Sequence, residues 1–174
     1  MKIALHDSGS EEHLQFMHQL GVEYVVSAIE PGKSGALEVE QVQRKKDYYA
    51  EHGLIWDVIE NLSPEIYYKV MLGQEGREQQ MDQVCASIRA VGQAGIGVLQ
   101  YQWMLLGGLR TEYSPTGRGG ARYPRFDMDV AERMPAAAMD WLGSVVYPTV
   151  PDRELSAEAV WDNLHFFLER AVPV

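Results

Sequence analysis

The sequence has few of the residues that mark several common classes of protein. It contains one cysteine, Cys85, in 174 residues, which excludes an internal disulfide and a cysteine-rich metal site. Cys85 falls in an amphipathic stretch, where we expect a buried helical residue. No apolar run reaches about 18 residues, the length that spans a bilayer, and MKIALHDSGSEE has no signal-peptide core. These absences predict a soluble protein of the reducing cytoplasm without a membrane partner.

Basic residues are also scarce. The chain has 15 Lys and Arg against 25 Asp and Glu, a net charge of -10, and its acidic residues are spread along the whole length. A nucleic-acid surface needs a basic face. We therefore expect no nucleic-acid partner.

The five histidines do not form a metal-binding pattern. Only His6 falls at the end of a predicted strand. His13 and His18 are five residues apart, so they do not share a helix face as a metal-binding pair four residues apart does. His52 precedes a glycine and His165 lies in the last predicted helix. The histidines alone predict no metal site in this segment.

What the sequence does have is a junction that occurs three times. An amphipathic stretch ends at a glycine and a β-rich run follows at once, in HQLGVEYVVSAI, AEHGLIWDVIE and GQAGIGVLQYQW. Gly21, Gly53 and Gly95 stand where the end of a helix favours a residue in the left-handed conformation. The pattern indicates three helix-to-strand connections.

Strands and helices are predicted to alternate along the chain. The β-rich runs predict strands at about 2–7, 23–29, 54–60 and 96–103, and the apolar periodicity predicts helices at about 11–20, 36–52 and 77–94, with a last helix capped by Ser156. Strict alternation favours an α/β fold with parallel strands joined by crossovers. Four βα units are half of a (β/α)8 TIM-type barrel, so we predict one partial barrel domain over residues 1–174.

The segment 104–155 is a long insertion after the fourth strand, rich in Gly and Pro. It far exceeds the usual connection of about 2 to 6 residues. LRTEYSPTGRGGARYPRF predicts a hairpin, and VAERMPAAAMDWL predicts a short helix that Pro135 interrupts. Arg118, Arg122 and Arg125 are either a lid for an anionic ligand or solvated loop charges.

Candidate site residues follow the predicted strands, because parallel barrels build their sites at the carboxyl ends of the strands. Arg110 is placed to bind a carboxylate with both guanidinium nitrogens, or else it pairs with Glu112 or Asp127. The other candidates are His6 with Asp7 after strand one, Glu60 and Asn61 after strand three, and Tyr101, Gln102 and Trp103 in strand four. Each has a structural alternative: a capped turn for the first pair, a bonded strand end for the second, and helix-facing core for part of the third group.

These segments resemble a known family. GLIWDVIENLSPEIYYKVMLGQEGREQQMDQVCASIRAVGQAGIGVLQYQWM, followed by LRTEY, RYPRFD and AVWDNLHFFLERAVPV, resembles the amino-terminal half of the mannonate dehydratases, which are xylose-isomerase-like TIM barrels. The family typically has Tyr-Asn-Phe-Met-Pro at the fourth strand, where this chain has YQWML, and Asp-Trp where it has Gly108 and Leu109.

The resemblance implies a lyase of glucuronate catabolism that dehydrates the sugar acid D-mannonate to 2-keto-3-deoxygluconate with a divalent metal, manganese or iron. In the family, His, Cys, His and Asp residues of later strands hold the metal, so this segment is expected to contribute substrate contacts and no metal ligands. Two alternatives remain: a sugar isomerase or epimerase on the same barrel, and a truncated binding module without activity. Because four open parallel strands leave unpaired edges, we expect a homo-oligomer or an aggregation-prone chain.

Overall fold

The computed structural model describes residues 2–104, 110–114, 117–133 and 155–174. The chain divides into two compact units, and each is described by itself. The first unit is Met1–Trp103 with Pro151–Val174, and the second is Met104–Val150.

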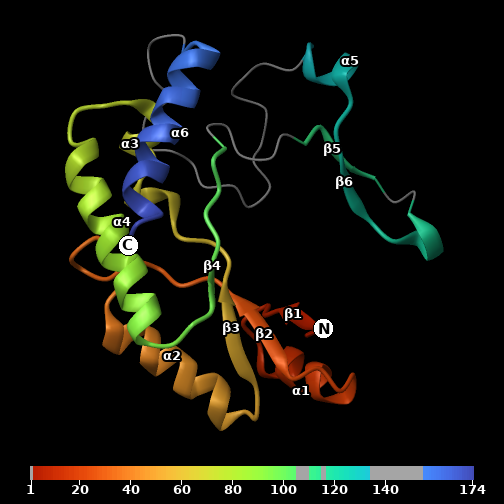
Figure 1. The fold of residues 1–174 in the computed structure, drawn as a ribbon. Helices are drawn as coiled ribbons and strands as arrows, with labels where there is room; N and C mark the ends of the chain where they lie inside the picture. Colours follow the sequence, from red (N-terminus) through yellow and green to blue (C-terminus); the bar gives the residue numbers. More distant parts are fainter. Residues whose placement is uncertain (1, 105–109, 115–116, 134–154) are drawn as a thin grey trace. The chain divides into compact units, whose positions relative to one another are not determined.

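A parallel sheet of four strands forms the centre of the first unit. Its strands are β1 (Ala4–His6), β2 (Tyr24–Ser27), β3 (Ile55–Ile59) and β4 (Val98–Leu99), which lie in the order β1-β2-β3-β4 (Figure 1). All three neighbouring pairs are parallel. Helices α1 (Glu11–Gln19), α2 (Val39–Glu51), α4 (Arg77–Gln93) and α6 (Ala157–Ala171) follow the strands. This confirms the predicted α/β fold of alternating strands and helices.

The three predicted glycine junctions have one common geometry. Gly21, Gly53 and Gly95 adopt φ values of +70°, +69° and +72°. After each glycine, the next amide donates a hydrogen bond to a carbonyl five residues earlier: Val22 to Met17 at 3.0 Å, Leu54 to Tyr49 at 2.9 Å, and Ile96 to Val91 at 3.2 Å. This is the Schellman ending, which needs a left-handed residue and directs the chain into the next strand.

Other elements differ from the prediction. β4 is only two residues long, and the short helices η1 (Pro64–Ile66) and α3 (Tyr68–Leu72) precede α4. The apolar run YKVML forms α3, and this short helix contacts α4 and α6. Helix α2 begins three residues later than predicted, since its N-cap Glu38 is extended, with φ −112° and ψ 142°, and the Leu37 amide before it donates to Ser87 Oγ of α4 at 2.9 Å.

The core lies between the sheet and its helices. The side chains of Val25, Trp56 and Ile59 are at most 2% exposed, and Trp56 packs on Tyr49 of α2 with ring centroids 5.9 Å apart.

Ser156 caps α6 as predicted, since its side chain accepts a hydrogen bond from the Ala159 amide. Cys85, in the middle of α4, is half-buried rather than buried, and its Sγ lies 3.6 Å from the Arg170 carbonyl oxygen of α6.

The second unit contains the predicted hairpin. Strand β5 (Glu112–Ser114) pairs antiparallel with β6 (Tyr123–Arg125), around the turn η2 (Arg118–Gly120). Helix α5 (Met128–Ala131) covers the start of the second predicted element, a turn follows at 132–133, and the rest of that element lies outside the described residues. No helix in the described parts of the chain is long and apolar enough to cross a membrane.

Candidate functional site

The carboxyl ends of the four strands form one edge of the sheet, and the register fixes which residues share a face there. His6 is aligned with Val26, Val26 with Val58, and Val58 with Val98. These four residues point away from the helices, because their neighbours Val25, Ile59 and Leu99 are on the side of the helical core. We call this side of the sheet the open face.

Two further polar residues continue the open face. Glu60 follows Ile59 and Gln100 follows Leu99, so alternation returns both side chains to the open face. Their amides extend the parallel pairing, from Glu60 to the Ser27 carbonyl at 3.2 Å and from Gln100 to the Ile59 carbonyl at 3.0 Å. His6, Glu60 and Gln100 therefore come from three strands to one edge. Gln100 was not among the residues predicted from the sequence. Its spacing of two from Val98 indicated that both side chains lie on the same face of the strand.

Glu60 and Asn61 are both half-buried at the end of β3. The part of the chain that the structure describes offers no hydrogen bond or ion pair to the Glu60 carboxylate. The Asn61 Oδ1 atom is buried and has no hydrogen-bond partner among the described residues. A buried carbonyl oxygen without a partner costs about 1–3 kcal/mol, so it favours a donor from a ligand. Both groups remain predicted substrate contacts.

The three candidates in strand four divide between the two faces. Tyr101 and Trp103 contact Phe167 of α6, with ring centroids 5.1 and 5.3 Å apart. Gln102 lies between them in the chain, and alternation turns its side chain to the open face. Tyr67 fixes the backbone of Gln102, because the Tyr67 hydroxyl donates to the Gln102 carbonyl and accepts from the Gln102 amide. The visible contacts of Tyr101 and Trp103 are packing contacts, and their role in binding stays a prediction.

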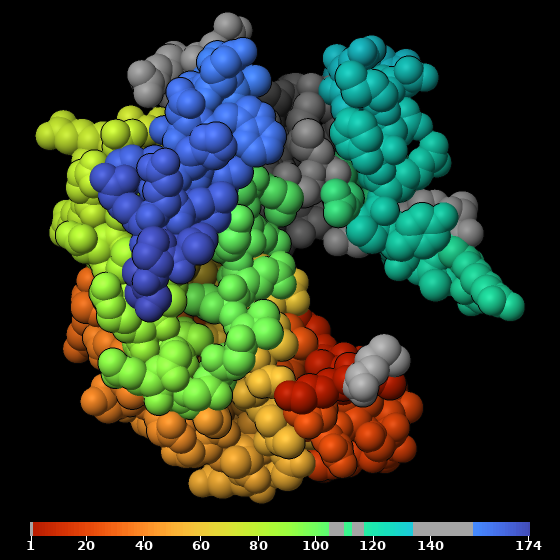
Figure 2. All heavy atoms as spheres, viewed as in Figure 1, coloured from red at the N-terminus to blue at the C-terminus, as the bar shows by residue number. Residues whose placement is uncertain are grey.

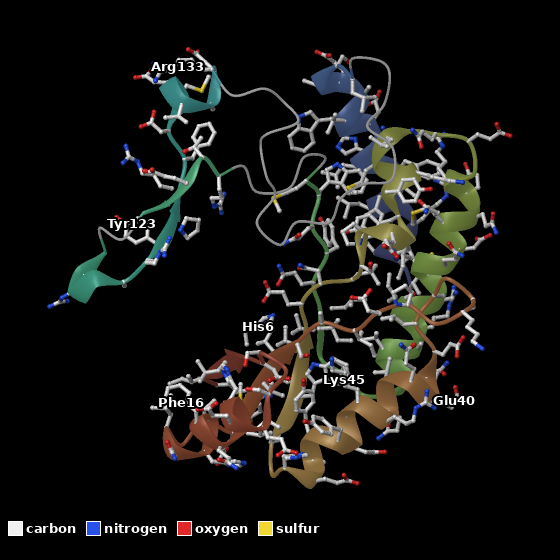
Figure 3. The ribbon with its side chains drawn as sticks, turned by 180° about the vertical axis from the view of Figure 1, so that it is seen from behind. His6, Phe16, Glu40, Lys45, Tyr123 and Arg133 are labelled. Atoms are coloured by element: carbon white, nitrogen blue, oxygen red, sulfur yellow. The ribbon has the colours of Figure 1, made fainter. Side chains whose placement is uncertain are left out.

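An open cleft of about 360 Å³ lies where β1 and β2 end. Its lining includes His6, Asp7, Glu30 and Lys45; His6 comes from β1 and Lys45 from α2, and both are labelled in Figure 3. The Lys45 ammonium donates to the Ala28 carbonyl. Burial lowers the pKa of Lys45, and the nearby Asp7 and Glu30 carboxylates oppose that shift.

Asp7 has a structural role beside this cleft. Its Oδ1 atom accepts from the Gly9 amide at 2.9 Å, and its Oδ2 atom accepts from the Tyr49 hydroxyl at 2.7 Å. The side chain therefore caps the turn before α1, which is the structural alternative expected for it.

A pH prediction follows from the Tyr49 hydroxyl. Burial raises the pKa of Tyr49 above its usual value of 10.0, and the hydrogen bond to Asp7 adds to the shift, while Ser27 opposes it. The pKa of Tyr49 is higher in the folded protein than in the unfolded chain. The protonated Tyr49 hydroxyl therefore contributes stability in full below about pH 10, and this contribution is lost as the pH rises further. We expect Tyr49→Phe to make the decline in unfolding free energy above about pH 10 shallower, by up to about 1.4 kcal/mol per pH unit. Urea denaturation at several pH values measures this, and parallel curves for the two proteins would contradict it.

Arg110 belongs to the second unit and is exposed. In that unit, Arg125 pairs with both Glu112 and Asp127, at 3.1 and 2.8 Å, and these are the two carboxylates that were considered as partners of Arg110. The binding role of Arg110 stays a prediction. So does the lid role of Arg118 and Arg122, which are exposed on the same hairpin.

The parallel βα sheet with polar groups at its carboxyl edge defines half of a barrel of the (β/α)8 class. Comparison with known proteins identifies the family, because the family model described as D-mannonate dehydratase matches residues 1–174. The chain therefore belongs to the D-mannonate dehydratase family.

Individual relatives agree with this assignment. Mannonate dehydratase 1 of Halalkalibacterium halodurans is 24% identical over 187 residues, which cover 97% of this chain and 51% of the relative. Mannonate dehydratase 1 of Bacillus licheniformis is 26% identical, over 88% of this chain and 47% of its own. The crystal structure of mannonate dehydratase from Streptococcus suis serotype2 matches 99% of this chain and 49% of its own, with a TM-score of 0.78 and 21% identity, and so shares the fold. The chain spans about half the length of these relatives.

Proposed function

We propose that this segment forms the substrate-binding, amino-terminal half of a sugar-acid dehydratase that acts on D-mannonate in glucuronate catabolism. The observation that carries the proposal is the match of the D-mannonate dehydratase family over the whole chain. The carboxyl edge supports it, because His6, Glu60 and Gln100 lie at the carboxyl ends of three strands, the end at which a barrel of this class binds its ligand.

The reaction sets the demands on the site. A base removes the proton from the carbon next to the carboxylate, hydroxide leaves from the following carbon with a proton from an acid, and the resulting enol becomes the 2-keto acid with release of one water. A polyol substrate offers several hydroxyls. Glu60 can accept their hydrogen bonds and Gln100 can both donate and accept. The planar pair of donors on Arg110, in the second unit, suits a carboxylate, and carboxylate binding is the role that we propose for it.

The resemblance implies manganese or iron, and the described residues do not fit such a metal. A site of this kind needs several His, Cys, Asp or Glu ligands close together. No group of three or more such residues that could hold a metal ion occurs in the described ranges. We therefore assign metal binding to residues beyond those described and derive no step from a metal here.

Ligand binding to this chain tests the proposal. We expect D-mannonate to shift the NMR signals of the His6 imidazole and the Gln100 side-chain amide, and D-fructose and D-xylose at equal concentration to shift them less. A stronger response to the ketose or aldose would support the isomerase or epimerase alternative instead. If no sugar or sugar acid shifts these signals, the segment is not a substrate-binding half.

A further inference from the structure

The cleft at the ends of β1 and β2 carries charges of both signs. Its lining includes the side chains of Lys45, Asp7 and Glu30. β1 and β2 are paired side by side, and the red and red-orange atoms of their segments lie against each other in Figure 2. His6 lines this cleft and also belongs to the carboxyl edge. The cleft is therefore continuous with the edge at which we propose that the substrate binds.

Lys45 is held at the cleft by contacts within the first unit. Its ammonium donates to the Ala28 carbonyl and lies 5.5 and 6.0 Å from the ring centroids of Trp56 and Tyr49. The carbonyl takes one of the three N–H groups of the ammonium, and the described residues provide no second hydrogen-bond acceptor for it. The ammonium can therefore donate further hydrogen bonds to a ligand in the cleft.

The charges of the cleft favour hydroxyl groups over a carboxylate as its ligand. Asp7 and Glu30 both act on the charge of Lys45, and two carboxylates beside one ammonium disfavour a further anion. Asp7 uses both of its oxygens, on the Gly9 amide and the Tyr49 hydroxyl. The Glu30 carboxylate is exposed, and the described residues offer it no hydrogen bond. A hydroxyl can donate to Glu30 and accept from Lys45, whereas a carboxylate can only accept.

We infer that this cleft binds the hydroxylated tail of the sugar acid, the carbons beyond the two that react, and that Lys45 and Glu30 select substrates by chain length. The cleft volume of about 360 Å³ is near the lower end of the range for small-molecule sites, about 300–1,000 Å³, so it suits part of a sugar-acid chain. The inference rests on the proposed function, because it assigns one end of that substrate. The tail takes no part in the dehydration, so these contacts act on binding alone.

Binding of a full-length and a shortened sugar acid to the 174-residue chain tests the inference. L-Erythronate has the configuration of D-mannonate at both reacting carbons and lacks its last two carbons. By NMR titration we expect D-mannonate to bind about tenfold tighter than L-erythronate, because only the longer acid fills the cleft and hydrogen-bonds its charged groups. D-mannonate should shift the side-chain signals of Lys45, and L-erythronate should leave them in place.

Two variants of the cleft are expected to remove this preference. Lys45→Met should weaken D-mannonate binding about tenfold and leave L-erythronate binding unchanged, and Glu30→Gln should act in the same direction by about threefold to tenfold. Lys46→Met is the matched control. Lys46 lies on the same helix and also donates to a carbonyl, that of Ala94 at 2.7 Å, but it does not line the cleft. This variant makes the same change in charge and should leave both affinities unchanged.

Three results would overturn the inference. These are equal affinities of the wild-type chain for the two acids, a Lys45→Met variant that weakens both acids alike, and a Lys46→Met variant that changes the preference as much as Lys45→Met does. If Lys45→Met loses its helical signal in circular dichroism, the same comparison with Glu30→Gln decides, because that side chain is exposed. When D-mannonate binds but the preference is absent, only the inference fails. When neither acid binds, the proposed function fails with it.

Discussion

Replacing Phe167 by alanine is expected to lower the free energy of unfolding by about 3–5 kcal/mol, the usual cost of removing a buried aromatic ring. The Phe167 side chain is 3% exposed, and its ring contacts three other aromatic rings, those of Tyr67, Tyr101 and Trp103. Tyr67 in turn holds the backbone of Gln102 through two hydrogen bonds. The cavity would therefore loosen the end of strand four as well as the core.

The neighbouring residue in α6 is the matched control. Phe166 is half-buried and lies between two guanidinium groups on the α4 side, so Phe166→Ala removes partly exposed cation–π contacts, worth about 0.5–1 kcal/mol each. Chemical denaturation of both variants measures the difference. Equal losses would show that the cluster around Phe167 does not carry the packing of α6 on strand four.

Replacing Glu60 by glutamine is expected to weaken D-mannonate binding about 10-fold to 100-fold. The substitution keeps the shape of the side chain and removes the charge, and hydrogen bonds to a charged group contribute about 1.5–3 kcal/mol. The described residues offer the Glu60 carboxylate no partner that would compete with substrate hydroxyls. Its position beside Gln100 on the open face is the reason to expect the contact.

Titration calorimetry or NMR titration of D-mannonate measures this effect. Glu40→Gln is the control, because Glu40 is an exposed carboxylate on α2 that lies away from His6 (Figure 3). It makes the same change in net charge and should leave the affinity unchanged. If Glu60→Gln leaves the affinity as little changed as Glu40→Gln does, Glu60 is not a contact.

The sequence predicted the elements best where local rules dominate. The left-handed glycines and the Ser156 cap are confirmed, because each depends on residues within one turn. The parallel alternation is also confirmed, because a helix between two strands favours a parallel crossover. The prediction failed for α3 and for the start of α2, where distant groups decide the outcome. The Leu37 amide bonds to Ser87, 50 residues away, and no local pattern reveals that contact.

For the site, the sequence indicated which residues lie at the strand ends but not which face of the sheet each side chain occupies. It grouped Tyr101, Gln102 and Trp103 together and left out Gln100, whereas the structure turns Tyr101 and Trp103 to Phe167 of α6. The sequence also did not indicate that Lys45 of α2 donates a hydrogen bond to the carbonyl of Ala28, the residue after β2.

By itself, then, the sequence determined the order of strands and helices, the ends of the helices and the family resemblance, because these depend on periodicity, on backbone preference and on short motifs. Only the tertiary structure decided which polar side chains share the open face and which aromatic side chains pack against α6. The physical reason is that the direction of a side chain depends on the register between strands and on the packing between helices. Both are set by contacts between residues far apart in the chain.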